Sequence, residues 1–600
     1  MVYDDSTFRA FRSSTLCCLL GLNLLVGAAV GAPLEVRFLT GQSAVGTDQA
    51  WGSFSTPFIN GRGNVAFAGG FSSSIVSGVW TDAGGPRLVA RFGDDAPGIT
   101  PNMPFRLGSF RSVVLAETGH VGFTAVVPID GDPRFREGAW METSDPPGSG
   151  SLSLLAVGNG PAPAAGPTAV FSRVGSPRFL APGKALFWAS SRESESASQS
   201  RGGVYLADAD RPGQLIRVVG ERDPALTFAE DGEWINFWGW KANGLGQVAY
   251  VMTALSKTLD LKVRGLWTSD PDGSTTLIPR VLDGDSAPGF EPGHYFSNIR
   301  PATVHNDRGQ IAFGATRNTA PTSSRDNRPR SGIWVSEPDG SIRLVEEGSA
   351  TDFSMNDHGE VAYWRAGSIK TEAYGRFGQA ERLAVEGGPV PSLGPFVTFS
   401  RLSIPTINNA RQTAFNSVFR GRGITKENDR ALWATDLNGL LQLVVREGDE
   451  IDLSDDPDNP DLRTLESWTW SNFNDAGELP FKARFTDGSE AIVIAKTLAT
   501  AATLRGDFDG SGRVDQTDLD HVLSSWGKLR FFTSGLPWRN TEGLSTSIVD
   551  QEELNRVLSN WGHSVEPDKD ALVIAEVPEP IWGFVLPTAV AIAFRKRLTG

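Results

Sequence analysis

The chain has 600 residues, of which 40% are hydrophobic and 21% charged, a composition typical of a folded protein and not of a disordered one. Its formal net charge of −15 at pH 7 argues against a nucleic-acid-binding protein, because contacts to phosphate need clustered Lys and Arg. Glycine (67 residues) and proline (37) are abundant, which favours many short strands joined by tight turns over long helices.

The first 32 residues have the order of a secretory signal peptide. Arg9 and Arg12 precede an apolar run over residues 16–30, and small residues follow up to Ala32. We therefore predict a signal peptide over residues 1–32, with an N-terminal membrane anchor as the alternative. Both cysteines lie in this run, so the mature protein is expected to have neither a disulfide nor a thiol nucleophile.

A segment of the type Asn-x-x-Gly-x-Val-Ala-Phe/Tyr recurs eight times along residues 60–481. Asn and Gly tolerate the left-handed backbone of a tight turn, and the Val-Ala-Phe that follows has the alternation of a strand with one buried face. The copies end at aromatic residues that we call anchors: Phe67, Phe123, Phe187, Tyr250, Phe313, Tyr363, Phe415 and Phe481.

Three further strands are expected in each repeat. A Gly-Ile-Trp-Val type strand follows the anchor, as at Gly78-Val79-Trp80, with a weak version around Tyr374 in the sixth repeat. A strand such as Arg87-Leu88-Val89-Ala90-Arg91 comes next and runs into a turn of the type Gly-Asp-x-Ala-Pro-Gly. A fourth strand is expected just before the next Asn-x-x-Gly, near Phe110, Phe171, Phe237, Phe296 and Phe396.

Four short antiparallel strands in each unit are typical of a β-propeller blade, so a mainly β fold is predicted over residues 33–499. The eighth repeat has no Leu-Val-x-Arg strand of its own, whereas a strand of this type over residues 34–39 precedes the first repeat. We therefore expect the N-terminal strand to complete the last of eight blades and so to leave no open sheet edge. Seven blades or an open β-solenoid are the alternatives.

Residues 500–565 are predicted to form a small helical calcium-binding module. Asp507, Asp509 and Ser511 stand at positions 1, 3 and 5 of a twelve-residue loop, Gly512 takes the turn, Arg513 offers its carbonyl at position 7, and Asp515 and Asp518 stand at positions 9 and 12. This alternation of oxygen donors suits Ca²⁺, which prefers six or more oxygen ligands.

The loop is followed by Asp518-Leu519-Asp520-His521-Val522-Leu523-Ser524-Ser525-Trp526-Gly527, which is echoed at residues 553–562 with apolar residues at helical spacing. Two loop–helix units in tandem resemble a type I dockerin, an EF-hand-like module, and this resemblance implies a cohesin-like protein partner. In the second loop only Asp550 and Glu553 remain as oxygen donors at positions 9 and 12, so we predict one calcium site and not two.

The chain ends with a linker (residues 566–576) and a tail (residues 577–600) in which Val577-Pro578-Glu579-Pro580 precedes a 14-residue apolar segment and Arg595-Lys596-Arg597. This tail resembles the PEP-CTERM signal of bacterial surface proteins, which is read by an exosortase. Surface proteins with such tails also carry propeller-like repeats similar to these. The resemblance implies a secreted or cell-surface location with contact to the membrane through the tail. The apolar segment is shorter than the ~20 residues of a comfortable span, which favours a transient signal.

No catalytic motif stands out in the sequence. The six histidines are scattered without ligand spacing, and no nucleophile elbow, His-Glu-x-x-His pair or P-loop is present. We therefore predict an exported, surface-sorted, non-catalytic protein whose propeller binds an extracellular polysaccharide or a protein. The alternative is a glycoside hydrolase or lyase, which would need acids or aromatics in one blade that the other blades lack.

Overall fold

The computed structural model describes two compact units, residues up to 498 and residues from 499 onward. The described residues are 32–497, 514, 516–526, 554, 557 and 558, without the gaps at 72–76, 100–102, 107–109, 130–131, 144–146, 149–151, 182, 209–214, 270–276, 291, 301–302, 320–329, 349–352, 366–367, 373–380, 392, 394–395, 438, 440, 455 and 457.

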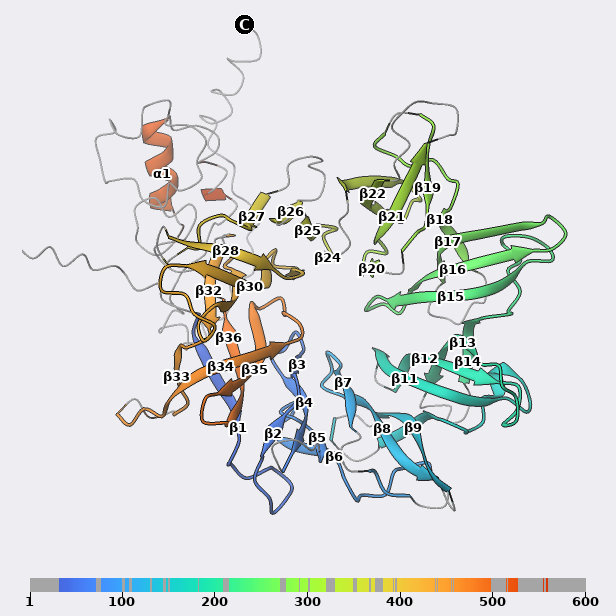
Figure 1. Ribbon diagram of the computed structural model, residues 1–600, viewed down its shortest axis with the longest axis horizontal. Coiled ribbons are helices and arrows are strands. Elements are labelled where there is room, and N and C mark those ends of the chain that lie inside the picture. The colour runs from blue at the N-terminus through green and yellow to red at the C-terminus, as the bar shows by residue number, and fades with distance from the viewer. Residues whose placement is uncertain are drawn as a thin grey trace, which may run out of the picture. The chain divides into compact units, whose positions relative to one another are not determined.

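The first unit is an eight-bladed β-propeller, as the repeat count predicted, in which eight antiparallel sheets surround a common centre (Figure 1). The inner strands, which face that centre, are β2 (Ser53–Phe54) with β3 (Phe58–Ile59), β7 (Arg111–Leu115), β11 (Val170–Ala181), β15 (Glu233–Ala242), β19 (His294–Ser297) with β20 (Thr303–His305), β24 (Phe353–Met355), β28 (Val397–Leu402) with β29 (Thr406–Ile407), and β34 (Leu462–Trp470).

The second strands of the blades carry the anchors. They are β4 (Val65–Gly70), β8 (Val121–Ile129), β12 (Lys184–Arg192), β16 (Val248–Ser256), β21 (Ile311–Thr319), β25 (Val361–Arg365), β30 (Thr413–Gly421) and β35 (Glu478–Phe485). The third strands are β5 (Gly78–Thr81), β9 (Asp132–Glu142), β13 (Arg201–Asp208), β17 (Leu261–Ser269), β22 (Arg330–Ser336), β26 (Ser368–Glu372), β31 (Arg430–Thr435) and β36 (Glu490–Lys496).

The outer strands are β6 (Arg87–Arg91), β10 (Leu152–Val157), β14 (Leu215–Gly220), β18 (Ile278–Leu282), β23 (Ile342–Glu347), β27 (Glu381–Val385), β32 (Leu441–Arg446) and β1 (Leu34–Leu39). Two smaller elements complete the unit: a 3-10 turn at Pro163–Ala165 and β33 (Glu450–Asp452), which pairs with β34.

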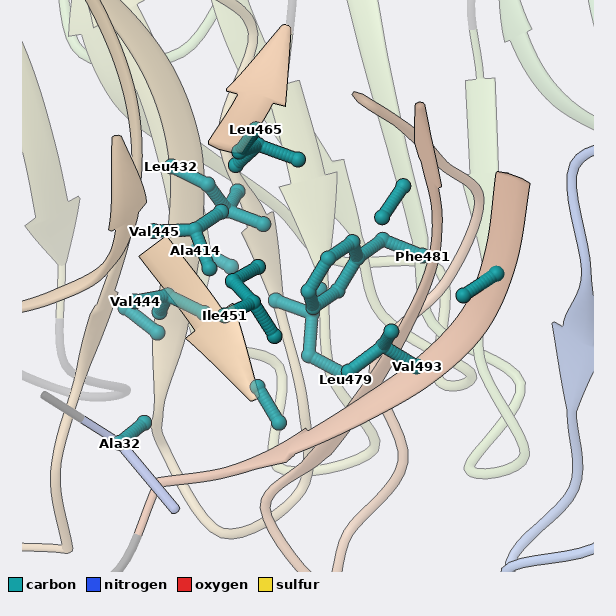
Figure 2. Packing of buried hydrophobic residues seen from close by; sticks show 14 of the residues in the cluster. Ala32, Ala414, Leu432, Val444, Val445, Ile451, Leu465, Leu479, Phe481 and Val493 are labelled. Carbon is teal, nitrogen blue, oxygen red and sulfur yellow. The ribbon is translucent and has the colours of Figure 1, made fainter. Parts of the chain in front are cut away.

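Ring closure occurs as the sequence predicted. Strand β1 pairs antiparallel with β36, from Leu34 opposite Ala495 to Leu39 opposite Ala491, and becomes the outer strand of the eighth blade. Apolar side chains of the seventh and eighth blades pack in one cluster that also includes Ala32 (Figure 2). The alternatives of seven blades and of an open solenoid are therefore wrong.

Six of the eight blades pair the aromatic anchor with another aromatic residue across the second and third strands. In four blades the anchor and its cross-strand partner stack with ring planes 18–22° apart and centroids 5.8–6.3 Å apart: Phe67 with Trp80, Phe123 with Trp140, Phe187 with Tyr205 and Phe313 with Trp334. These rings are buried, which explains why aromatic residues recur at these positions.

One expected strand position needs correction. In the sixth blade the third strand is β26, which ends at Glu372 and so precedes Tyr374. This error comes from a shorter loop that the repeat motif does not show. In the seventh blade the strand expected near Phe396 is β28, which begins at Val397, and its buried aromatic residue is Phe399, because Phe396 is 71% exposed.

The Asn of the repeated turn links neighbouring blades. Its amide nitrogen donates a hydrogen bond to the backbone carbonyl at the same position of the next blade, and the last of these links joins the eighth blade to the first. The links run from Asn60 to Ala116 (3.0 Å), Asn243 to Asn306 (2.9 Å), Asn306 to Asn356 (2.9 Å), Asn356 to Asn408 (3.1 Å), Asn408 to Asn474 (2.7 Å) and Asn474 to Asn60 (3.0 Å).

In the second unit the structure describes one helix, α1 (Gln516–Ser525), which overlaps the first helix expected after the calcium loop. Val514, Asp518, Val522 and Val557 are buried. The remainder of residues 500–565, the linker, the signal peptide up to residue 31 and the C-terminal tail lie outside the described residues.

Candidate functional site

A carboxylate that directly follows the outer strand connects one blade to the next in three places. In each case the carboxylate accepts a hydrogen bond from a backbone N–H on the inner edge of the following blade. The bonds run from Phe237 to Glu221 (3.3 Å), from Ile299 to Asp283 (3.3 Å) and from Leu402 to Glu386 (3.2 Å). The recurring acid therefore has a structural role, because it satisfies an inner-strand donor.

Glu447 directly follows β32 and occupies this position in the seventh blade, but in the described part of the chain its carboxylate does not accept a hydrogen bond from the inner strand of the eighth blade. Trp468 of β34 is the equivalent of Leu402, since each pairs with the residue two places after its anchor. No described group donates a hydrogen bond to Glu447 Oε2, although the residue is only 7% exposed. The insertion of β33 between β32 and β34 accompanies this difference.

A pocket of about 260 Å³ lies beside Glu447, between the seventh and eighth blades. We call it the interblade pocket, and its lining residues are Arg401, Leu402, Ser403, Asn416, Ser417, Val418, Arg430, Glu447, Ser467 and Trp468. Strands β28, β30 and β31 of one blade and β34 of the next supply these residues, apart from Ser403 and Glu447, which directly follow β28 and β32.

The polar groups of the pocket are held in place by hydrogen bonds. The indole N–H of Trp468 donates to Asn416 Oδ1 (3.0 Å), and the backbone N–H of Asn416 donates to Ser403 Oγ (2.8 Å). Because Trp468 is tied to the neighbouring blade, the aromatic wall of the pocket is fixed and does not depend on a mobile loop.

A second difference in the seventh blade also concerns the pocket. The equivalent tryptophans of three other blades donate their indole N–H to turn carbonyls: Trp80 to Val45 (3.0 Å), Trp140 to Pro97 (3.1 Å) and Trp334 to Pro288 (3.2 Å). Trp433 instead donates its indole N–H to Ser417 Oγ (2.9 Å). The Ser417 hydroxyl, which belongs to a buried residue that lines the pocket, is therefore held in place by Trp433.

Two charged side chains, Arg430 and Asp429, act on the Glu447 carboxyl. Burial raises the pKa of the Glu447 carboxyl, the Arg430 guanidinium opposes this shift, and the Asp429 carboxylate adds to it. The Nε of Arg430 lies 3.8 Å from Glu447 Oε1 and 4.0 Å from Asp429 Oδ1. The pocket therefore offers a carboxyl group whose pKa is raised by burial, together with a cation, and a second acid lies beside them.

The predicted calcium ligands are not part of this pocket. Asp518 is buried within α1, while Asp507, Asp509, Ser511, Arg513 and Asp515 lie outside the described residues. Within the described ranges, no group of three His, Cys, Asp or Glu side chains is placed to hold a metal ion. None of the helices in that part of the chain has the length and apolar character needed to cross a membrane.

The interblade pocket could not be predicted from the repeat motif. Glu447 follows its strand in the same way as Glu221 and Glu386, so the motif alone gives no sign that its carboxylate is free. The long segment between the outer strand β32 and the next inner strand β34 was the one available signal in the sequence.

Fold and pocket together define an eight-bladed β-propeller with a polar pocket between two of its blades. The chain belongs to a family of unknown function, DUF7453, whose model matches residues 27–225, 148–364 and 373–500. No curated protein matches the chain.

Several solved propellers are similar to this chain at low sequence identity. The β-propeller domain of the trilobed protease from Pyrococcus furiosus is 8% identical with a TM-score of 0.34, over 64% of this chain and 92% of that chain. The Dos1 propeller is 10% identical with a TM-score of 0.35, over 78% and 96% of the two chains. The uncomplexed acylaminoacyl peptidase from Pyrococcus horikoshii is 11% identical with a TM-score of 0.32, over 64% of this chain, which spans about half (52%) of the peptidase.

Proposed function

We propose that this protein is exported, sorted to the cell surface by its C-terminal tail, and binds a glycan in the interblade pocket without turning it over. The observation that carries this proposal is the combination of the Trp468 ring with the free oxygen of Glu447 in one pocket. A sugar ring presents an apolar face that packs on an aromatic side chain, and hydroxyls that pair with carboxylate, amide and guanidinium groups.

The size of the pocket favours a glycan over a protein partner. A stable protein interface buries about 800 Å² on each side, whereas a concave site with a few convergent polar groups suits a small ligand. A cavity of about 260 Å³ lies at the small end for ligand pockets, so we expect it to take a short part of a glycan and to leave the remainder in solvent.

The glycan proposal is tested with the full mature chain and a panel of neutral and acidic oligosaccharides, by calorimetry and tryptophan fluorescence. We expect Trp468→Ala to weaken binding at least about tenfold, that is by about 1.4 kcal/mol. Trp238→Ala is the matched control, because Trp238 is half-exposed in the fourth blade and lies outside the pocket. Equal losses in both variants, or no binding by the wild type, would exclude this pocket as the glycan site.

Glu447 and Glu221 should respond in opposite ways to truncation. Glu447→Ala should raise Tm at neutral pH, because the folded state holds a carboxyl whose pKa is raised by burial. Its cost is fully present above the folded pKa and disappears as the pH falls below the unfolded pKa. Glu221→Ala should lower stability by about 1–2 kcal/mol, because the Phe237 N–H loses its acceptor.

Thermal unfolding of both variants at pH 7 and at acid pH measures this difference. The glycan panel should show that Glu447→Ala loses binding while Glu221→Ala keeps it. A fall in Tm for Glu447→Ala that matches the fall for Glu221→Ala would mean that Glu447 has the same structural role as the other acids.

Glycoside hydrolysis is the second candidate, and the Asp429–Glu447 pair is the observation that favours it. Two neighbouring carboxyl groups, one with its pKa raised by burial, are the arrangement that glycosidases use for acid–base chemistry. If the glycans that bind are also cleaved, Glu447→Gln and Asp429→Asn should each abolish product formation and leave binding measurable. Absence of product from every bound glycan would exclude this candidate.

We also propose that residues 500–565 bind one calcium ion through Asp507, Asp509, Ser511, the Arg513 carbonyl, Asp515 and Asp518. The carboxylate-rich loop of the sequence supports this, and an extracellular loop of this type binds with a Kd of about 10⁻⁴–10⁻³ M. Such an affinity suits a structural ion between the propeller and the tail. A cohesin-like protein remains a proposed partner of this module, and exosortase-type machinery remains the proposed partner of the tail.

Calcium titration of the mature chain, with terbium luminescence as the readout, tests the loop. Asp507→Ala should abolish the single binding event, since it removes the first ligand of the loop. Asp550→Ala, in the second and degenerate loop, should leave it unchanged. Two equal binding events in the wild type would contradict the single-site prediction.

A further inference from the structure

One position of the inner strand differs between blades in a way that packing does not require. This position pairs across the strands with the residue that precedes the anchor. Because it lies on the innermost strand, it lies close to the centre of the ring. In blades one to seven it is occupied by Phe58, Val114, Arg178, Lys241, Val304, Ser354 and Thr406. Two adjacent blades, the third and the fourth, thus place cations where the other five have uncharged residues.

Arg178 lines a cavity of about 540 Å³ at the centre of the ring, which we call the central cavity. Its lining comes from the inner edges of five consecutive blades, from the eighth to the fourth, with Asn472, Phe58, Val114, Arg178 and Gly244 as representatives. Arg178 lies in the wall itself, and Lys241 is its equivalent on the next strand.

Neither cation has a partner of its own. Among the described residues, no ion pair or hydrogen bond involves the Arg178 guanidinium or the Lys241 ammonium. Burial lowers the pKa of Arg178, and burial together with the charge of Arg178 lowers the pKa of Lys241. Asp307 is the opposite charge that Arg178 senses, but its carboxylate already accepts the Gly244 N–H. The pair therefore costs stability in the empty cavity.

The fifth blade adds a polar group at the adjoining position, just before the turn Asn. Other blades have an apolar residue there, such as Ile59, Ala242, Met355 and Ile407, whereas the fifth has His305. His305 is 7% exposed, and its Nδ1 has no hydrogen-bond partner in the described structure. Burial and the charges of Arg280 and Arg178 lower the pKa of His305 to about 4, so the ring is neutral at physiological pH.

We propose that the central cavity binds a tetrahedral oxyanion, of the phosphate or sulfate class, between Arg178 in its wall and Lys241 at the equivalent position of the next inner strand. A dianion balances the two charges, the guanidinium fork matches two of its oxygens, and the ammonium binds a third as a point charge. The cavity is several times larger than the ion, so an ester of a sugar fits as well as the free ion. This site is separate from the interblade pocket and does not depend on it.

The test compares Tm of the mature chain in sodium sulfate, sodium phosphate and sodium chloride at equal ionic strength and low millimolar anion. The wild type should be stabilised by sulfate or phosphate over chloride, because an anion that binds only the folded state raises Tm. Lys241→Thr and Arg178→Val install residues that other blades carry at this position. Each should raise Tm in chloride, because repulsion is relieved, and each should remove the sulfate-specific rise.

Lys426→Thr and Arg422→Val are the matched controls, since both side chains are exposed and distant in sequence from the cavity wall. They should keep the sulfate-specific rise. A rise of equal size in Lys241→Thr or Arg178→Val would overturn the proposal, as would a wild type with no preference over chloride. If either variant fails to fold, calorimetric titration of Lys241→Gln with sulfate decides, with loss of heat expected.

A second arm distinguishes the source of the oxyanion. Titration with a monosaccharide sulfate and a monosaccharide phosphate is compared with the inorganic ions. Tighter binding of an ester means that the cavity holds the group as part of a sugar, and equal binding means that the free ion is the ligand. Binding of none of these probes would contradict the proposal.

Discussion

Removal of residues 33–39 should abolish the cooperative unfolding transition of the propeller and leave an aggregation-prone chain. Strand β1 is the outer strand of the eighth blade, and its loss exposes the hydrogen-bonding edge of β36 along five residue pairs. An open edge of this kind is a template for pairing with other chains. The deletion also removes Phe38, whose ring lies 4.8 Å from Phe67 and 5.3 Å from Trp51.

A point variant measures the same contribution without removing the strand. Phe38 is 5% exposed, so Phe38→Ala should lower the free energy of unfolding by about 3–5 kcal/mol, the usual cost of truncating a buried Phe. A chain that begins at residue 33 is the control and should unfold as the wild type does, since β1 is intact. Denaturant unfolding measures all three. A Phe38→Ala variant as stable as the wild type would mean that closure does not depend on this core.

Removal of one of the Asn links between blades should also cause a large loss of stability. In Asn356→Ala the Asn408 carbonyl loses its inter-blade donor, and the N–H groups of His358 and Glu360 lose the side-chain oxygen to which they donate (3.0 Å each). Since these groups are buried or half-buried, we expect a loss of about 2–4 kcal/mol, which denaturant unfolding measures. Asn408→Ala should behave alike, because the same kinds of bonds are lost.

The second blade shows how much of the expected loss of stability comes from the hydrogen bond between blades and not from the turn itself. Ala116 replaces Asn there, yet the turn keeps its two backbone bonds, Ala116 N–H to His120 (2.9 Å) and Gly119 N–H to Ala116 (2.9 Å). The equivalent bonds at Asn356 are 3.1 and 3.0 Å long. The turn therefore does not need the Asn side chain, and the expected loss reports on the cohesion of the blades. Far-ultraviolet circular dichroism unchanged from the wild type is the companion result, and a collapse of strand content would contradict this reading.

The repeat architecture could be predicted from the sequence because the same motif occurs eight times along the chain. The strand of residues 34–39 was assigned to the last blade from its motif alone, and the structure pairs it there. A repeated motif averages over the irregularities of single copies, and this is also its weakness. Where a loop is shortened, as before β26, the motif placed the strand too late in the chain.

The candidate site could not be predicted from the sequence, for a related reason. A repeat motif shows what the copies share, whereas Glu447 and the Arg178–Lys241 pair are exceptions whose meaning depends on register and on partners. Glu447 is the same residue type at the same place as Glu221, and the two differ in their hydrogen bonds and in the inserted strand β33 that follows Glu447. Such a difference lies in the relation between blades and not in any one segment.

The closure of the ring also sets an order in time. Strand β1 is the first strand of the chain, and its partner β36 is the last strand of the propeller, so the pair joins Leu34 to Ala495. Contacts between residues so distant along the chain form late, because the loop between them must be ordered first. A chain that is synthesised from its N-terminus must therefore keep this strand unpaired until the eighth blade has been made.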